Sequence, residues 1–203
     1  MTLSQITFFF LGIMGVIVIA MLVHSYLDKK KIRNKLKNLT QHLQGDVIQE
    51  SVFQYPRYHS EINGRVFDLF FDVAKVGRHH ILYSIYSLAA SLPYPMLLVK
   101  NDEFRPITDM AGFTKTNGSL LPAIDTVFQG YSLHPEWAEQ VYIDGSIKKT
   151  ISELDEFSSL QLGPDALIAG KPYEGLSDTD SEKTIQAIKT LEKLAQEIET
   201  HGK

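Results

Sequence analysis

The sequence of 203 residues contains no cysteine. This absence excludes disulfide bonds, thiolate metal ligands and cysteine nucleophiles, and it agrees with a cytoplasmic domain. The chain also lacks the GxxxxGK[ST] and GxGxxG loops that bind phosphates, and its histidines have no HxxxH or HExxH spacing. We therefore expect neither a metal nor any other cofactor.

Charge is absent from the first 27 residues, which include the apolar run at residues 6–23. A helix of about 18 residues covers about 27 Å, close to the hydrocarbon thickness of a bilayer. Residues 1–26 are therefore predicted to form a transmembrane anchor. A cleaved signal peptide fits less well, because no basic residue precedes the run and no small-x-small cleavage site follows it. A buried core helix is the third alternative.

A basic cluster follows the apolar run, and it sets the expected orientation. Basic flanks stay in the cytoplasm, so we expect the N-terminus outside and the main domain inside, at the inner (plasma) membrane of a bacterium. Each basic residue near the surface attracts anionic lipid head groups with about 1 kcal/mol. The predicted membrane-surface residues are Lys29, Lys30, Lys31, Arg33, Lys35 and Lys37.

Residues 27–45 are predicted to form a basic juxtamembrane helix. Its apolar residues recur at helical spacing, and Gly45 is expected to end it as a C′ glycine. This stripe either packs on the chain's own domain or pairs with another helix, although it is shorter than the three to four heptads of a coiled coil. The stripe consists of Ile32, Leu36, Leu39 and Leu43.

Residues 46–203 are expected to form one acidic soluble domain. The chain has 20 basic and 24 acidic residues; six and one of these precede residue 46, which leaves 14 and 23 in the domain. An excess of acidic residues disfavours contacts with phosphate groups, so we expect no nucleic-acid partner.

The fold class predicted for this domain is α+β, an antiparallel sheet with helices packed on one side. Asn63-Gly64 is a strong hairpin signal between strands at residues 57–62 and 65–73. Two more apolar runs, at residues 80–89 and 96–100, complete a predicted meander of about four strands.

The second half alternates between helical and strand patterns. A loop with a short strand is expected at residues 101–122, a strand at 125–133, and hairpin strands on either side of Gly163-Pro164-Asp165. Helices are predicted to begin at His134-Pro135 and to cover residues 146–157. A capping box at Thr179 and Glu182 should open a last helix, whose charged face is expected to be solvated.

Several polar residues are weighed as catalytic candidates. His79 and His80 point to opposite faces of a strand, and Asp68 and Asp72 lie about 13 Å apart on one face, too far for a pair of catalytic carboxylates. The ingredients of a nucleophilic site are present, but no GxSxG elbow organises them. These ingredients are His59, His134, Ser132 and Asp144.

The segment at residues 125–137 contains Asp125, Phe128 and Gly130, followed by His134-Pro135-Glu136-Trp137. In this pattern the chain resembles bacterial single-pass membrane-anchored α+β domains of unknown function. The resemblance implies no catalytic residue.

The predicted function is that of a non-enzymatic membrane-anchored accessory, scaffold or assembly protein, whose partners are a membrane protein or complex and the lipid bilayer. The alternative is a membrane-tethered enzyme, a hydrolase by preference, with a site near His79 and His80 or in the loop at residues 101–122.

Overall fold

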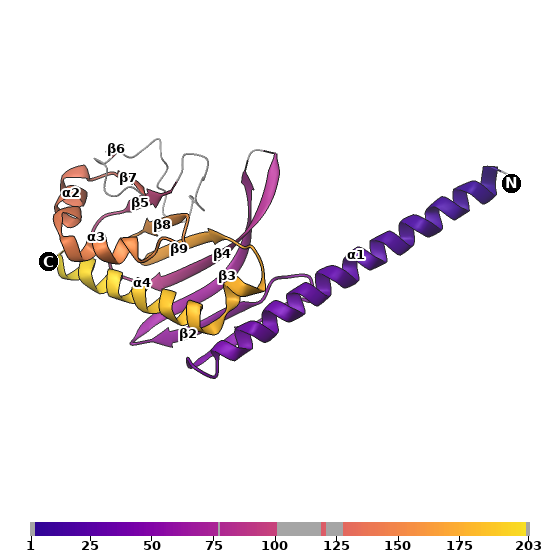
Figure 1. Ribbon diagram of the computed structural model, residues 1–203, viewed down its shortest axis with the longest axis horizontal. Coiled ribbons are helices and arrows are strands. Elements are labelled where there is room, and N and C mark those ends of the chain that lie inside the picture. The colour runs from indigo at the N-terminus through magenta and orange to yellow at the C-terminus, as the bar shows by residue number, and fades with distance from the viewer. Residues whose placement is uncertain (1–2, 77, 101–118, 121–127, 202–203) are drawn as a thin grey trace.

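The computed structural model describes residues 3–76, 78–100, 119–120 and 128–201. A helix of 37 residues, α1 (Leu3–Leu39), leads into an antiparallel sheet covered by further helices. The first half of α1 stands clear of the domain, and its second half lies along it (Figure 1). The predicted α+β class is confirmed.

In the described part of the chain, nine strands form one sheet, and every neighbouring pair is antiparallel. The order across the sheet is β1-β2-β3-β4-β9-β8-β5-β7-β6. The strands are β1 (Gly45–Ile48), β2 (Arg57–Ile62), β3 (Arg65–Val76), β4 (His79–Ala89), β5 (Met96–Val99), β6 (Ser119–Leu120), β7 (Gln129–Ser132), β8 (Ser159–Leu162) and β9 (Ala166–Pro172).

The hairpin between β2 and β3 has the predicted turn. Asn63 and Gly64 both adopt positive φ, 51° and 79°, as a two-residue type I′ turn requires. Asn tolerates this region better than most residues, and Gly enters it without a steric penalty. The turn therefore fixes the register in which Ile62 pairs with Arg65.

The predicted four-strand meander is wrong at its last step. Strands β2, β3 and β4 are consecutive, but β9 pairs with β4, and β8 separates β9 from β5. Strand β1 was not predicted, and it includes Gly45, which therefore does not cap α1. The helix ends earlier, at Leu39.

The helix that begins after His134 is confirmed as α2 (Pro135–Ile143), with proline at its start and Glu136 in its first turn. Helix α3 (Gly145–Ser152) is shorter than predicted, because a turn follows Ser152. The Asp144 carboxylate caps α3 by accepting a 2.7 Å hydrogen bond from the backbone N–H of Ser146.

The last helix, α4 (Ser181–His201), follows a short 3₁₀ turn, η2 (Leu176–Thr179). The predicted cap is one residue out of place, since the Asp180 carboxylate accepts from the Glu182 N–H at 3.1 Å. Thr179 instead lies in η2, where its hydroxyl donates to the Leu176 carbonyl.

One large core lies between the helices and a single face of the sheet, as predicted (Figure 1). Helices α1, α3 and α4 contribute apolar residues to it, and the sheet contributes alternate residues of its strands. The sheet's share includes Tyr58, Phe67, Leu69, Tyr86, Leu88, Leu160, Leu167 and Ala169.

Candidate functional site

The first half of α1 has the properties of a membrane span. From Thr7 onward the helix is long and apolar enough to cross a bilayer, with a mean hydropathy of 2.4 in its most apolar window. None of that window is buried against the rest of the chain, whereas the core helix of a soluble protein would be mostly buried. A membrane anchor and a signal sequence are the two explanations that fit this exposure.

The second half of α1 belongs to the domain. Leu36 and Leu39 are fully buried and Ile32 nearly so, all in the main core, and Leu43 packs against the same core. Of the two explanations for the apolar stripe, packing on the chain's own domain is the one that the structure favours. The candidate span and the domain are therefore joined by an unbroken helix rather than by a flexible linker.

Lys29 lies on the domain side of α1, at the level where the helix leaves the domain. It is only 8% exposed, and its ammonium donates to the backbone carbonyl of Phe53. The same nitrogen lies 5.1 Å from the centre of the Tyr55 ring, a cation–π distance. Lys29 therefore fastens the connection between β1 and β2 to the helix, unlike the other predicted membrane-surface residues, which are more exposed.

An apolar groove lies between this connection and β3. It has a volume of about 530 Å³; six of the eleven residues that line it are aromatic or aliphatic, and Glu50, Arg57 and Asp72 add charge at its walls. Phe53 is 68% exposed and Val73 50%, which leaves large apolar side chains open to a partner. The apolar residues that line the groove are Ile48, Phe53, Tyr55, Phe70, Phe71 and Val73.

On the sheet face opposite the helices, Asp68 is 7% exposed, and its carboxylate lies between the side chains of Arg57 and His59. The Arg57 guanidinium donates to both carboxylate oxygens at 2.8 and 2.6 Å, and His59 Nδ1 lies 2.8 Å from Oδ1. Burial raises the pKa of Asp68, but the bonds from Arg57 and His59 outweigh burial and hold that pKa below its ordinary value. This cluster links β2 to β3. It was missed because the sequence analysis considered Asp68 only as a possible carboxylate partner of Asp72, and not its neighbours across the hairpin.

The candidate catalytic residues are dispersed. His79 and His80 are exposed at the start of β4, where they pair with Val76 and Lys75 of β3. Asp72 accepts a hydrogen bond from the adjacent Val73 N–H. The structure does not bring these residues together with Asp68.

The other ingredients of a nucleophilic site have structural partners. Ser132 donates to the Pro95 carbonyl and accepts from the His134 N–H, and the ring of His134 stacks 4.2 Å from that of Tyr94. Asp144 is the cap of α3. The alternative site in the 101–122 loop lies outside the described residues, apart from the two residues of β6.

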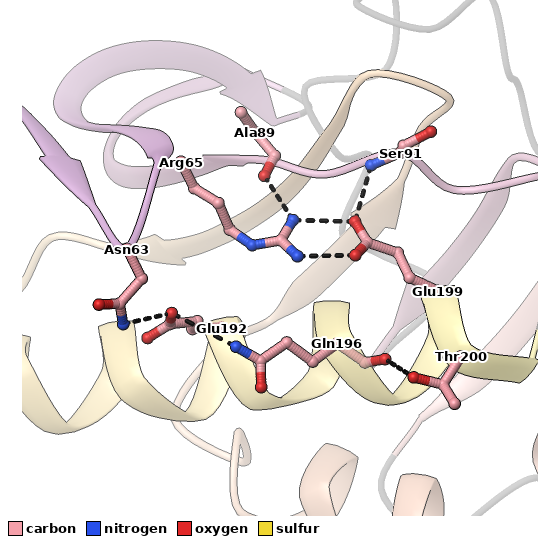
Figure 2. Close-up of polar contacts among 8 residues, drawn as sticks. All are labelled: Asn63, Arg65, Ala89, Ser91, Glu192, Gln196, Glu199 and Thr200. Atoms are coloured by element: carbon pink, nitrogen blue, oxygen red, sulfur yellow. Dashed lines mark hydrogen bonds and ion pairs between the residues drawn. The ribbon is translucent and has the colours of Figure 1, made fainter.

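A polar network ties the β2–β3 hairpin to α4 (Figure 2). The Arg65 guanidinium makes two bonds to the Glu199 carboxylate, at 2.8 and 2.6 Å, and one to the Ala89 carbonyl. Glu199 also accepts from the Ser91 N–H, and Asn63 donates to Glu192 at 2.6 Å. The predicted solvated face of α4 is therefore wrong for Glu192, which is buried, and for Glu199, which is partly buried.

The network was missed because its two side-chain pairs, Asn63–Glu192 and Arg65–Glu199, join residues more than 120 positions apart. The one local signal is the spacing of Glu192 and Glu199, which are seven residues apart and so lie on one side of the helix. Across the described residues, no group of three or more histidine, aspartate or glutamate side chains is placed to hold a metal ion.

No protein-family model and no curated protein matches the sequence. The fold is similar to that in the crystal structure of the mycobacterial trehalose monomycolate transport factor A, TtfA, with a TM-score of 0.58. The match covers 84% of this chain and 93% of that one at 10% identity, so it concerns the fold alone. The resemblance to bacterial membrane-anchored domains stays a prediction, and Asp125 lies outside the described residues.

Proposed function

We propose that this chain is a non-enzymatic accessory protein of a membrane complex, anchored by α1, with its domain on the cytoplasmic side. The observation that carries the proposal is the burial of Ile32, Leu36 and Leu39 in the core of the domain. A span that continues into the core holds the domain at a set distance and angle from the bilayer. Such a rigid mounting suits a protein that presents a surface to a neighbour in the membrane.

Anchoring is favoured over cleavage of a signal sequence. A cut soon after Val23 would fall within the unbroken helix α1, shortly before Lys29 and Ile32, which already contact the domain. The orientation rests on the basic residues that follow the span, since such flanks are retained in the cytoplasm. Protease added to right-side-out vesicles should leave the domain intact, and digestion of the domain would refute this orientation.

The similarity to TtfA supports an accessory role in a general way. TtfA is named as a transport factor, and this chain shares its fold over most of both chains. We extend to this chain only the proposal that it serves a membrane transport or assembly complex. The acidic charge of the domain supports basic protein partners rather than nucleic acid.

We place the partner in the apolar groove beside β3. Phe53 and Val73 are exposed there, and Tyr55 and Phe71 form its floor with ring centres 5.7 Å apart. Exposed aromatic residues in a concave surface are typical anchors for a protein partner. The groove adjoins the point where α1 leaves the domain, so a partner bound there would also lie near the membrane.

Affinity purification of the full chain from detergent-solubilised membranes tests the proposal. Val73→Glu places a charge in the groove, and burial of an unpaired charge is costly. This variant should therefore reduce the amount of copurified partner by about tenfold or more. Val66→Glu is the matched control, because Val66 is also an exposed valine of β3 (46%, against 50% for Val73) but does not line the groove. Recovery of the wild-type chain alone would refute the accessory role, and equal loss in both variants would refute the groove.

A further inference from the structure

The predicted membrane-surface residues do not form a uniform basic collar. Lys29 faces inward, as described above. Lys30, Arg33 and Lys37 follow one another at spacings of three and four, so they share one side of α1, and all three are exposed. Lys31 and Lys35 share a different side, and Lys31 lies 3.8 Å from Asp28, a neighbouring carboxylate.

The first of these two sides faces a second groove, of about 220 Å³, between α1 and the start of the β1–β2 connection. Tyr26, Lys30, Arg33, Asn34 and Lys37 line it from the helix, and Gln49 and Val52 line it from the connection. No acidic side chain is among the described residues that line it. Three cations thus converge on one cavity without an internal counter-ion.

The connection is held in place beside these cations. Its backbone is attached to α1 through the bond from Lys29 to the Phe53 carbonyl, and it is braced internally by Gln49, whose side chain donates to the Gln54 carbonyl at 2.9 Å. Val52 and Phe53 are nonetheless exposed by 53% and 68%. A braced loop that presents two apolar side chains next to cations combines the two features that favour a membrane interface.

One end of the groove lies at the level of the head-group layer. Tyr26 lies three residues beyond Val23, the last residue of the apolar run, which is a rise of about 5 Å, and Lys30 is about 6 Å further on. The head-group layer is roughly 5 to 8 Å thick on each side of the bilayer. The Tyr26 end of the groove therefore lies in this layer, whereas the backbones of Arg33 and Lys37 lie about 15 and 21 Å beyond Val23, on its aqueous side. Side chains of a helix are tilted toward its N-terminus, so those of Lys30 and Arg33 extend back toward the layer.

We propose that this groove binds the phosphate of one anionic phospholipid head group. Lys30 and Arg33 would contact the phosphate, Lys37 would add charge from the aqueous side, Gln49 would donate a hydrogen bond, and Val52 would pack against the head group. The inference rests on the proposed membrane anchoring, but it is independent of the protein partner. It differs from general attraction of a basic segment to a charged surface, because only one side of α1 takes part.

The test uses the full chain reconstituted in phosphatidylcholine vesicles that contain a minor share of photoactivatable phosphatidylglycerol. Cross-linked peptides are mapped by mass spectrometry in the wild type, in Lys30→Gln/Lys37→Gln and in Lys31→Gln/Lys35→Gln. Both variants lose two lysine charges, so a general electrostatic effect would be the same in each. Circular dichroism and protease protection of the domain confirm that each variant is folded and inserted.

Cross-links should map to residues 30–37 and 49–53, and they should fall by about tenfold or more in Lys30→Gln/Lys37→Gln. The Lys31→Gln/Lys35→Gln variant should keep them within about twofold. Equal loss in both variants would overturn the proposal in favour of diffuse attraction. A loss of cross-linked peptides when glycerol phosphate or inorganic phosphate is added before photoactivation would contradict the proposal that the ligand is a lipid. Loss of the copurified partner would bear on the proposed function alone, because cross-linking in pure vesicles requires no partner.

Discussion

Lys29 and Phe53, 24 positions apart, are joined by a hydrogen bond from the lysine ammonium to the phenylalanine carbonyl. The bond connects α1, six residues beyond its apolar run, to the β1–β2 connection of the sheet. Its donor belongs to a cluster that the sequence assigns to the membrane surface. One basic residue of the cluster thus holds the β1–β2 connection against α1, while the other basic residues of the cluster are more exposed.

Loss of this bond should loosen the β1–β2 connection. Lys29→Met keeps most of the buried side chain but removes its charge, and a hydrogen bond from a charged donor contributes about 1.5 to 3 kcal/mol. We expect faster amide hydrogen exchange at Val52 to Tyr55 and little change in α4. Lys31→Met is the control, because Lys31 is exposed and, among the described residues, its ion pair is with Asp28 of the same helix. Unchanged exchange in Lys29→Met would contradict this role.

The second half of α1 should behave as part of the core. Leu36 is fully buried, so Leu36→Ala is expected to lower the free energy of unfolding by about 2 to 5 kcal/mol. Leu27→Ala makes the same change at a residue that is 45% exposed, so it should lower the free energy of unfolding far less. Chemical unfolding of the full chain in a mild detergent measures both. Equal effects would mean that α1 is a tether and not a core element.

The Arg65–Glu199 pair should couple the β2–β3 hairpin to the end of α4. Both side chains are partly buried and joined by two hydrogen bonds, a geometry that strengthens an ion pair. A double-mutant cycle with Arg65→Met and Glu199→Gln should give a coupling free energy of about 1 to 2 kcal/mol. A matched cycle on Lys193 and Glu197, an i,i+4 pair at 3.9 Å, should give about 0.5 kcal/mol or less. Similar values for the two pairs would contradict the structural role.

Acid should destabilise the domain partly through Asp68. Its pKa is lower in the folded chain than in the unfolded chain, because Arg57 and His59 outweigh its burial. The ionised Asp68 therefore makes its full contribution to the free energy of unfolding above the unfolded pKa of about 3.9. This contribution is lost as pH falls through the lower folded pKa. Asp68→Asn should be less stable at neutral pH and lose less stability on acidification. Asp72→Asn, on the same strand but exposed, should keep the wild-type slope in thermal unfolding scans across acidic pH.

Local signals in the sequence predicted many of the elements. Asn63-Gly64, His134-Pro135 and Gly163-Pro164-Asp165 each restrict a few backbone torsions, so their turns and the helix start are readable from neighbouring residues alone. The cap of α4 was misplaced by one residue because Thr179 and Asp180 are both good capping residues. The dispersal of His79, His80 and Asp72 was also foreseeable, since strand alternation sets their directions.

The strand order was not readable in the same way. Insertion of the β8–β9 hairpin between β4 and β5 joins residues such as Tyr86 and Ala169, which are far apart in the chain. Such pairings are chosen by the burial of whole faces, and many orders satisfy the same alternating pattern. The same limit applies to the Arg65–Glu199 pair, whose residues are 134 positions apart. The Asp68 cluster is different, because the register fixed by the Asn63-Gly64 turn places His59 opposite Asp68, so this contact could have been predicted from the sequence.

The sequence by itself determined the apolar run, the basic cluster behind it and the acidic α+β domain, because length, charge and periodicity are properties of neighbouring residues. Only the tertiary structure decided how the basic cluster is divided. Packing of Ile32, Leu36 and Leu39 on the sheet sets the rotation of α1 about its axis. That rotation turns Lys29 inward and directs Lys30, Arg33 and Lys37 into one groove.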